Sequence, residues 1–510
     1  MFTKIAIYLG IICLLVFREK TFAFALLGPI QPWMQLTNNA IAWDDIGGAT
    51  EIGSEYRWNV PVVTYGFDQS FLVFFGTNGV AAVESAIKIL NDLPPASSLA
   101  LTNFPTETGQ LNFFAQSQSL LDLKSTTLSL LLEQLGLAQP THSTFILKQR
   151  TPLFAQYAYA DGFSPYDLLY LFYWDTWAIP DFISQLNYDP ASLTVSPYVN
   201  NVLYSAYIFN WSKPDYGLQV FQLDPLANSY TAVADHALVA GRFYPGLTYD
   251  DVGGLAYLLS TNNINFETLL PGIVASGANP NAFINSAWRP GVNKITFVPQ
   301  PVASTLGNFL PFTNQFTDTY LTNASFHQQQ LVRVVSQPDF LFRAGDVVPD
   351  SIGLPFFRRT GTTNWLNNSV ANGNTNGVGP GVIQSQVQIM FNKLGRLLEA
   401  FGDEQPYDYS QHWASFDNST NPPVIYPVSQ TGTNQLTVRM WLMMGAHPKL
   451  FTHSFDWKPT SATGNQFTFQ TSTNLKTWVN LFTVPNDGSV YTYFDVNPPS
   501  LNRYYRLVPQ

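Results

Sequence analysis

The stretch QSQSLLDLKSTTLSLLLEQLGLAQ, residues 116–139, decides the fold of the N-terminal part of this chain. Its apolar residues recur at intervals of three, four and seven positions, the spacing that places them on one face of an α-helix. These residues are Leu128, Leu131, Leu132 and Leu135. Gly136 follows at the position where a helix commonly ends on a glycine with positive φ. We therefore predict an amphipathic helix over residues 116–135.

Elements on either side of this helix predict a mixed α/β domain over residues 26–290. Residues 60–67 are β-branched and aromatic, as a strand should be, and residues 80–90 repeat apolar side chains at helical spacing. A later helix is expected to begin at Thr248, because its hydroxyl and the carboxylate of Asp251 can form a capping box. This combination of a strand with helices predicts an α+β fold.

The remainder of the chain is predicted to be rich in β-strands. Residues 291–430 alternate short apolar runs with turn clusters, which indicates a β-rich middle region. Residues 361–381 are dominated by Gly, Asn and Thr and are typical of a linker, and a short helix is expected behind them at residues 389–400. Residues 435–510 are strand-like throughout, which favours a C-terminal β-sandwich.

Composition excludes several classes of protein. Hydrophobic residues make up 46% of the 510 positions, which is enough to bury large cores and excludes a disordered chain. Charged residues make up only 11% and the net charge is −10, so the chain offers no basic surface for nucleic acid or anionic lipid. The single cysteine, Cys13, excludes a disulfide framework and a cysteine-ligated metal site.

Residues 1–25 have the pattern of an export signal. A lysine precedes the apolar run at residues 5–17, and Ala23 and Ala25 are the small residues that precede a cleavage site. The run is shorter than the ~20 residues of a membrane-spanning helix, although basic residues behind it leave an uncleaved anchor open as the alternative. We expect a secreted or cell-surface protein that begins at Leu26 and has no membrane span in its mature chain.

The C-terminal block resembles a known kind of tail module. Its QTSTNLKTW segment (residues 470–478) and its RYYRL segment (residues 503–507) are similar to immunoglobulin-like or fibronectin-like tail modules of exported proteins from Verrucomicrobia and Planctomycetes. The resemblance covers only residues 435–510. It implies a spacer, an adhesion element or a surface-display tail rather than a catalyst.

The order of elements in the N-terminal domain resembles the metzincin fold, in particular matrixin-type metallopeptidases. In that family a strand and a helix precede a zinc helix with the motif H-E-x-x-H-x-x-G-x-x-H, and a later helix opens with L-[ST]-x-D-D-[IV]. This chain has SLLLEQLGLAQ at residues 129–139 and LTYDDV at residues 247–252. The order of the elements and the second motif agree with the family, whereas the zinc ligands do not.

The residues at the zinc positions are incompatible with the zinc-dependent hydrolysis of this family. The resemblance places Ser129, Glu133 and Gln139 at the three ligand positions and Leu130 at the position of the catalytic base. Catalytic zinc needs three protein ligands, an open water position and a carboxylate base. Only Glu133 is a good zinc ligand, and leucine cannot accept a proton. The resemblance therefore implies a pseudoenzyme without metal, cofactor or catalytic residue. Its degenerate cleft would be lined by Ser129, Glu133 and Gln139.

No other motif in the sequence indicates catalysis. The six histidines include no pair at helical spacing, and the chain has no nucleophile elbow, P-loop or dinucleotide fingerprint. Asp250 and Asp251 fit helix capping better than glycoside hydrolysis. We expect a non-catalytic binding or structural protein whose ligand is a protein or a glycan. The alternatives are an extracellular hydrolase, either a metzincin-like peptidase or a glycan-active enzyme, and a carbohydrate-binding protein that uses exposed Trp and Tyr.

Overall fold

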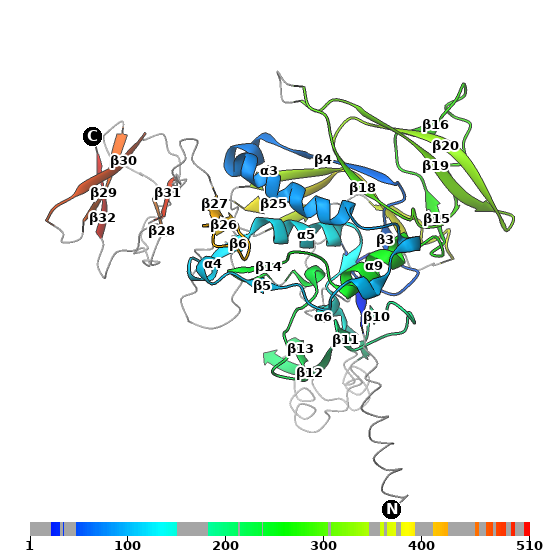
Figure 1. The fold of residues 1–510 in the computed structure, drawn as a ribbon, viewed down its shortest axis with the longest axis horizontal. Coiled ribbons are helices and arrows are strands. Elements are labelled where there is room, and N and C mark those ends of the chain that lie inside the picture. Colours follow the sequence, from blue (N-terminus) through cyan, green and yellow to red (C-terminus); the bar gives the residue numbers. More distant parts are fainter. Residues whose placement is uncertain are drawn as a thin grey trace, which may run out of the picture.

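A five-stranded sheet forms the centre of this computed structural model (Figure 1). Its order is β18-β4-β21-β25-β22, and the first four strands are parallel, while β22 is antiparallel. The strands are β4 (Val62–Phe67), β18 (Thr296–Pro299), β21 (Phe340–Gly345), β22 (Arg358–Gly361) and β25 (Val387–Asn392). The structure describes residues 22–30, 34, 47–149, 182–212, 215–236, 238–303, 308–345, 358–361, 365–373, 379–392, 412–426, 454–457, 466–472, 476–485, 491–494 and 504–509. The predicted strand at residues 60–67 is confirmed as β4.

Helix α3, Gln69–Asn91, follows β4 and packs on this sheet (Figure 1). The side chain of Asp68 caps its start by accepting a hydrogen bond from the amide of Phe71 at 3.0 Å. This range is longer than the prediction for residues 80–90, and it is interrupted by a kink at Gly76, whose φ of 61° and ψ of −162° are not helical. The predicted helix lies in the segment after the kink. Among the described residues, α3 is the one helix long and apolar enough to cross a membrane, and nearly half of its most apolar window is buried.

The predicted helix at residues 116–135 is divided into three elements. They are α4 (Phe113–Ser117), β6 (Leu120–Asp122) and α5 (Leu123–Gln134). Strand β6 pairs in parallel with β26 (His412–Ser415), which lies far away in the sequence. This tertiary pairing draws Leu120 and Leu121 out of the helix. Asp122 then caps α5 by accepting hydrogen bonds from the amide and hydroxyl of Ser125 at 2.8 and 2.5 Å.

Two local predictions around α5 and the later helix are confirmed. Gly136 ends α5 with φ 113°, a backbone conformation that favours glycine. Helix α9, Tyr249–Leu259, begins with the predicted capping box. The amide and hydroxyl of Thr248 both donate to the carboxylate of Asp251, at 2.9 and 2.5 Å. These features depend on residues within one helical turn, which is why the sequence shows them.

Strand β1, Phe24–Gly28, is completely buried. It pairs antiparallel with β2 (Gly48–Thr50), β7 (Leu137–Ala138) and β10 (Asn187–Tyr188). The predicted cleavage after Ala25 falls inside this strand and would remove the paired residue Phe24 from the core. The cleavage itself stays a prediction, at a position that this strand spans. The rest of the predicted signal, residues 1–21, lies outside the described residues.

A second five-stranded sheet is antiparallel throughout, with the order β15-β17-β19-β20-β16. Figure 1 shows it extending to one side of the central sheet. Strands β19 and β20 form a long hairpin whose turn residues, Asn323 and Ala324, both have positive φ, as in a two-residue hairpin turn. The strands are β15 (Asn265–Thr268), β16 (Ile273–Ala275), β17 (Ser286–Arg289), β19 (Phe312–Thr322) and β20 (Ser325–Val335).

The predicted boundary at residues 290–291 does not separate two cores. Strand β4 comes from the first predicted region, and its two neighbours in the central sheet, β18 and β21, come from the second. Their side chains belong to one hydrophobic cluster that includes Val63, Phe297 and Phe340. Both regions therefore fold together around the same sheet.

Two predictions for the middle region are corrected. Where it is described, the linker-like segment 361–381 is folded: β23 (Trp365–Asn367) pairs with β24 (Gly381–Ile383). The side chain of Asn372 also bonds the backbone amide and carbonyl of Phe266, each at 2.9 Å. The helix expected at residues 389–400 begins as strand β25 and otherwise lies outside the described residues. Pairing with β21 decides the strand.

Where it is described, the C-terminal part consists mainly of strands, as predicted. Strand β28 (Ser454–Trp457) pairs with β31 (Tyr491–Phe494), and β29 (Gln466–Ser472) pairs with both β30 (Val479–Pro485) and β32 (Tyr504–Pro509). The guanidinium of Arg506 lies 4.1 Å from the ring centre of Trp478, a cation–π contact. The immunoglobulin-like identity of this part stays a prediction.

Short elements connect these sheets and helices. They are β3 (Tyr56–Arg57), η1 (Ala96–Ser98), η2 (Leu101–Asn103), β5 (Gln110–Leu111), α6 (Pro140–Ser143), β8 (Ile146–Gln149), β9 (Phe182–Ser184), β11 (Tyr198–Val199), β12 (Val202–Ser212), β13 (Asp215–Gln222), η3 (Val233–Asp235), β14 (Arg242–Phe243) and β27 (Val424–Ile425). One of them, the 3-10 turn η3, packs against α5 and positions the candidate site.

Candidate functional site

Helix α5 places two of the predicted site residues, Ser129 and Glu133, one turn apart on the same face. This face meets η3 and the residue after it, His236. The hydroxyl of Ser129 donates to the carbonyl of Val233 at 2.6 Å and lies 2.9 Å from Nδ1 of His236. The carboxylate of Glu133 lies 3.8 Å from Nε2 of the same ring. The fold thus joins two predicted residues to a histidine that is 107 positions from Ser129.

The imidazole of His236 lies between a hydroxyl and a carboxylate. The Ser129 hydroxyl has one proton and two groups within reach, the Val233 carbonyl at 2.6 Å and Nδ1 of His236 at 2.9 Å. The opposite nitrogen, Nε2, faces the Glu133 carboxylate. The exposed fractions of Ser129, Glu133 and His236 are 1%, 7% and 7%, so solvent hardly reaches this contact. The arrangement fastens α5 to η3.

Asp251, the capping residue of α9, holds η3 in place. Its carboxylate accepts hydrogen bonds from the amides of Val233 and Ala234 at 3.1 and 2.9 Å, in addition to the two from Thr248. The turn ends at His236, whose φ is 55°. The start of α9 therefore determines where the imidazole lies relative to α5.

Two further carboxylates near the turn are buried and hydrogen-bonded. Asp235 accepts from the amide and hydroxyl of Thr141 at 2.8 and 2.7 Å, and burial raises the pKa of Asp235 to about 7 although these hydrogen bonds lower it. Asp250 accepts from the amide of Asn200 at 2.5 Å and from the amide of Ala23, and burial raises its pKa well above the usual value. Asp250 thereby ties α9 to the segment that leads into β1.

The other two predicted positions have different surroundings. Leu130 is buried in the main hydrophobic cluster. Gln139 is partly exposed at the start of α6, where its backbone carbonyl accepts from the amide and hydroxyl of Ser143 at 3.1 and 2.7 Å. The structure therefore brings Ser129 and Glu133 together and records Gln139 in a backbone role.

The donor set of this contact does not suit catalytic zinc. Glu133 and His236 are possible ligands by residue type, whereas three protein ligands are required. Within the described residues, no group of three His, Cys, Asp or Glu could hold a metal ion. A buried hydroxyl that donates to a carbonyl is also poorly placed to act as a nucleophile, because an activating base must accept its proton.

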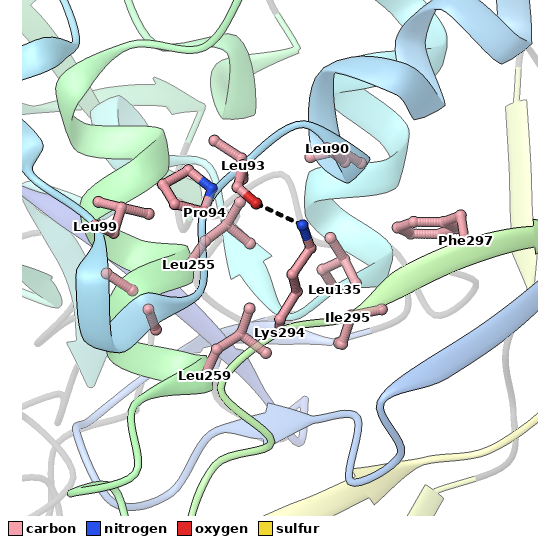
Figure 2. A pocket seen from close by; sticks show the side chains of 12 residues that line it. Leu90, Leu93, Pro94, Leu99, Leu135, Leu255, Leu259, Lys294, Ile295 and Phe297 are labelled. Atoms are coloured by element: carbon pink, nitrogen blue, oxygen red, sulfur yellow. Dashed lines mark hydrogen bonds between the residues drawn. The ribbon is translucent and has the colours of Figure 1, made fainter. Parts of the chain in front are cut away.

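A small pocket lies between the C-terminal ends of α3, α5 and α9 (Figure 2). Its wall is apolar and includes Leu135, Leu255 and Phe297. Lys294 lies at its edge, and its ammonium group donates to the carbonyls of Asn91 and Leu93, both at 2.8 Å. The enclosed volume of ≈ 30 Å³ is far below the ~300–1,000 Å³ of ligand-binding pockets. This pocket is a packing gap rather than a substrate site.

His236 is the site residue that sequence reasoning missed. The histidines of the sequence include no pair at helical spacing, and no local signal connects position 236 to α5. The contact exists because Asp251 folds η3 back against that helix.

Comparisons with known proteins found no matching family model, no matching curated protein and no matching solved structure.

Proposed function

We propose that this protein is exported and acts outside the cell or at its surface as a non-catalytic binding or structural protein. In this proposal the N-terminal domain is a degenerate metzincin-like domain and residues 435–510 form an immunoglobulin-like tail. One observation carries the proposal. The two polar residues of α5 at zinc positions, Ser129 and Glu133, contact Val233 and His236 and so attach this helix to η3. A buried packing contact replaces the open water position that zinc catalysis needs.

A hydrolase is the second candidate, because serine, histidine and glutamate are in contact. Serine hydrolases combine these groups as the nucleophile, the general base and the carboxylate that orients the base. Here, however, the Val233 carbonyl lies closer to Oγ of Ser129, at 2.6 Å, than Nδ1 of His236 does, at 2.9 Å, and competes for the hydroxyl proton. Ser129 is also 1% exposed, so a substrate carbonyl has no approach to Oγ. These observations favour the non-catalytic function.

Zinc content and turnover of the purified full chain test the proposal. We expect no stoichiometric zinc after dialysis against a zinc buffer, and no hydrolysis of peptide or polysaccharide panels. Bound zinc at one equivalent would contradict the proposal, and turnover that is lost in both Ser129→Ala and Glu133→Gln would establish the hydrolase. Ser85→Ala is the matched control, because Ser85 lies exposed on α3 and bonds only its own helix at Ala81.

Turnover in these variants must be compared at equal folded fraction. We expect Ser129→Ala to lower the free energy of unfolding by about 1–3 kcal/mol, because it leaves buried groups without a partner. Chemical denaturation of each variant measures this loss. A stability loss without any activity in the parent chain agrees with a structural role of the contact.

A further inference from the structure

The antiparallel sheet β15-β17-β19-β20-β16 carries its charged side chains on its buried face. Arg289 pairs with Asp318 at 2.9 Å, and Glu267 pairs at 2.6 Å with Arg57 from β3. All four side chains are nine-tenths or more buried. An antiparallel sheet with one solvated face usually turns its charges outward. In this sheet these charged side chains point inward instead, which leaves the chemical composition of the exposed face to be explained.

The exposed face of this sheet is uncharged. By strand alternation it carries threonine, serine and glutamine between apolar positions, and none of its strand residues is Asp, Glu, Lys or Arg. Gln330 and Thr317, both exposed, face each other across β20 and β19 and share a hydrogen bond of 2.8 Å. The face is therefore hydrogen-bonding but neutral, in a chain whose net charge is −10.

An apolar ridge crosses this face. Phe266, Trp288, Leu321 and Phe326 lie directly opposite one another on β15, β17, β19 and β20. Trp288 is 40% exposed and Phe326 is 59% exposed, and the rings of Phe266 and Trp288 meet edge to face at 5.8 Å. Three strand spacings make the ridge roughly 14 Å long. An exposed apolar row of this kind commonly marks an interaction site.

We propose that this ridge, with its flanking glutamines and threonines, binds a neutral polysaccharide chain. Sugar rings have apolar C–H faces that stack on aromatic side chains, and their hydroxyl groups can exchange hydrogen bonds with amides and hydroxyls. A neutral ligand matches the uncharged face, and the length of the ridge suits several sugar rings in a row. The inference rests on the proposed non-catalytic binding function, and it names the surface and the ligand class.

Other occupants fit this face less well. A lipid surface is attracted by basic residues around an apolar face, and this face has none. A protein interface usually has a closely packed centre that is more apolar than its rim, whereas here one apolar row lies between rows of glutamine and threonine. A second copy of the chain is tested below as an outcome.

Affinity electrophoresis of the full chain tests the proposal. Native gels contain hydroxyethylcellulose, mixed-linkage β-glucan, xyloglucan or galactomannan as neutral probes, and alginate as the anionic probe. We expect retardation by at least one neutral probe and none by alginate. Trp288→Ala and Phe326→Ala should each raise the Kd about tenfold, the effect of losing one ring stack. Phe113→Ala is the matched control, because Phe113 is 75% exposed on α4, outside the sheet.

Several outcomes would overturn the proposal. They are the absence of retardation by every neutral probe, equal retardation by alginate, and equal weakening by Phe113→Ala. Dimers that Trp288→Ala dissociates in sedimentation runs would assign the face to a second copy. If Trp288→Ala fails to fold, the Kd of Phe326→Ala, at the end of the hairpin, tests the proposal instead. Hydrolysis of a bound probe would refute the non-catalytic function and leave the proposed binding face intact. Absence of binding to every probe, without hydrolysis, would refute the binding face and leave the non-catalytic function intact.

Discussion

At the scale of single residues, Asp251 joins two parts of the fold. Its carboxylate accepts the two capping hydrogen bonds from Thr248 and two more from the amides of Val233 and Ala234. The first pair is local and follows from the sequence. The second pair determines where η3, and with it His236, lies. One side chain thus has a role that the sequence shows and a role that only the fold creates.

Asp235 predicts a pH dependence of stability. Burial raises the pKa of this carboxyl to about 7, so between pH ~4 and ~7 the folded chain binds the proton more tightly than the unfolded chain does. Its contribution to stability therefore falls as pH rises through this window. The side chain of Asp235→Asn cannot titrate. As pH rises through this window, we expect the free energy of unfolding of the variant to increase relative to that of the parent by up to about 1.4 kcal/mol per pH unit.

Urea unfolding of both chains at several pH values measures this slope. The slope is the relevant quantity, because the substitution also changes the bonds to Thr141 by an amount that does not depend on pH. Asp224→Asn, at an exposed position, is the control. Parallel stability curves for Asp235→Asn and the parent would contradict the prediction.

At the scale of elements, the end of α5 depends on one glycine. Gly136 has φ 113°, and an added Cβ would lie 2.2 Å from the carbonyl oxygen of Tyr56. We expect Gly136→Ala to lower the free energy of unfolding by more than ~3 kcal/mol, because both the backbone conformation and the space exclude it. Gly53→Ala, where φ is 84° but no atom lies within 4 Å, should cost only about 1–2 kcal/mol. Thermal unfolding compares them, and equal losses would refute the steric argument.

Strand β1 predicts where the mature chain begins. Phe24 and Ala25 are buried in the sheet, and loss of a buried phenylalanine alone costs about 3–5 kcal/mol. We expect a chain that begins at Leu26 to be much less stable than one that begins at Phe22. Near-ultraviolet circular dichroism and thermal unfolding test this difference. N-terminal sequencing of chain recovered outside the producing cells should then place its first residue at or before Phe22, and a start at Leu26 would refute the prediction.

At the scale of the whole molecule, the central sheet makes the two predicted regions interdependent. A fragment of residues 22–290 lacks β18 and β21, the two neighbours of β4. We expect this fragment to bind a hydrophobic dye and to lack a cooperative unfolding transition, as compact states without fixed packing do. The fragment 22–426 retains the sheet and should unfold cooperatively. Cooperative unfolding of the shorter fragment would restore the boundary at residues 290–291.

The sequence determined the elements whose signals are local. Strand β4, the capping box at Thr248 and the glycine at position 136 depend on neighbours within a few residues, so residue type and spacing suffice to predict them. The resemblance to the metzincin zinc helix named Ser129 and Glu133, and residues four positions apart lie on one face of a helix. The strand-like runs likewise predicted strands in residues 291–430 and 435–510.

Only the tertiary structure decided the features that need distant partners. Strand β6 replaces part of the predicted helix because β26 pairs with it, and His236 reaches α5 because Asp251 binds the intervening turn. The ridge that includes Trp288 and Phe326 likewise exists only through the register of four strands. Hydrogen bonds between segments far apart in the chain set these positions, and no pattern within a single segment contains that information.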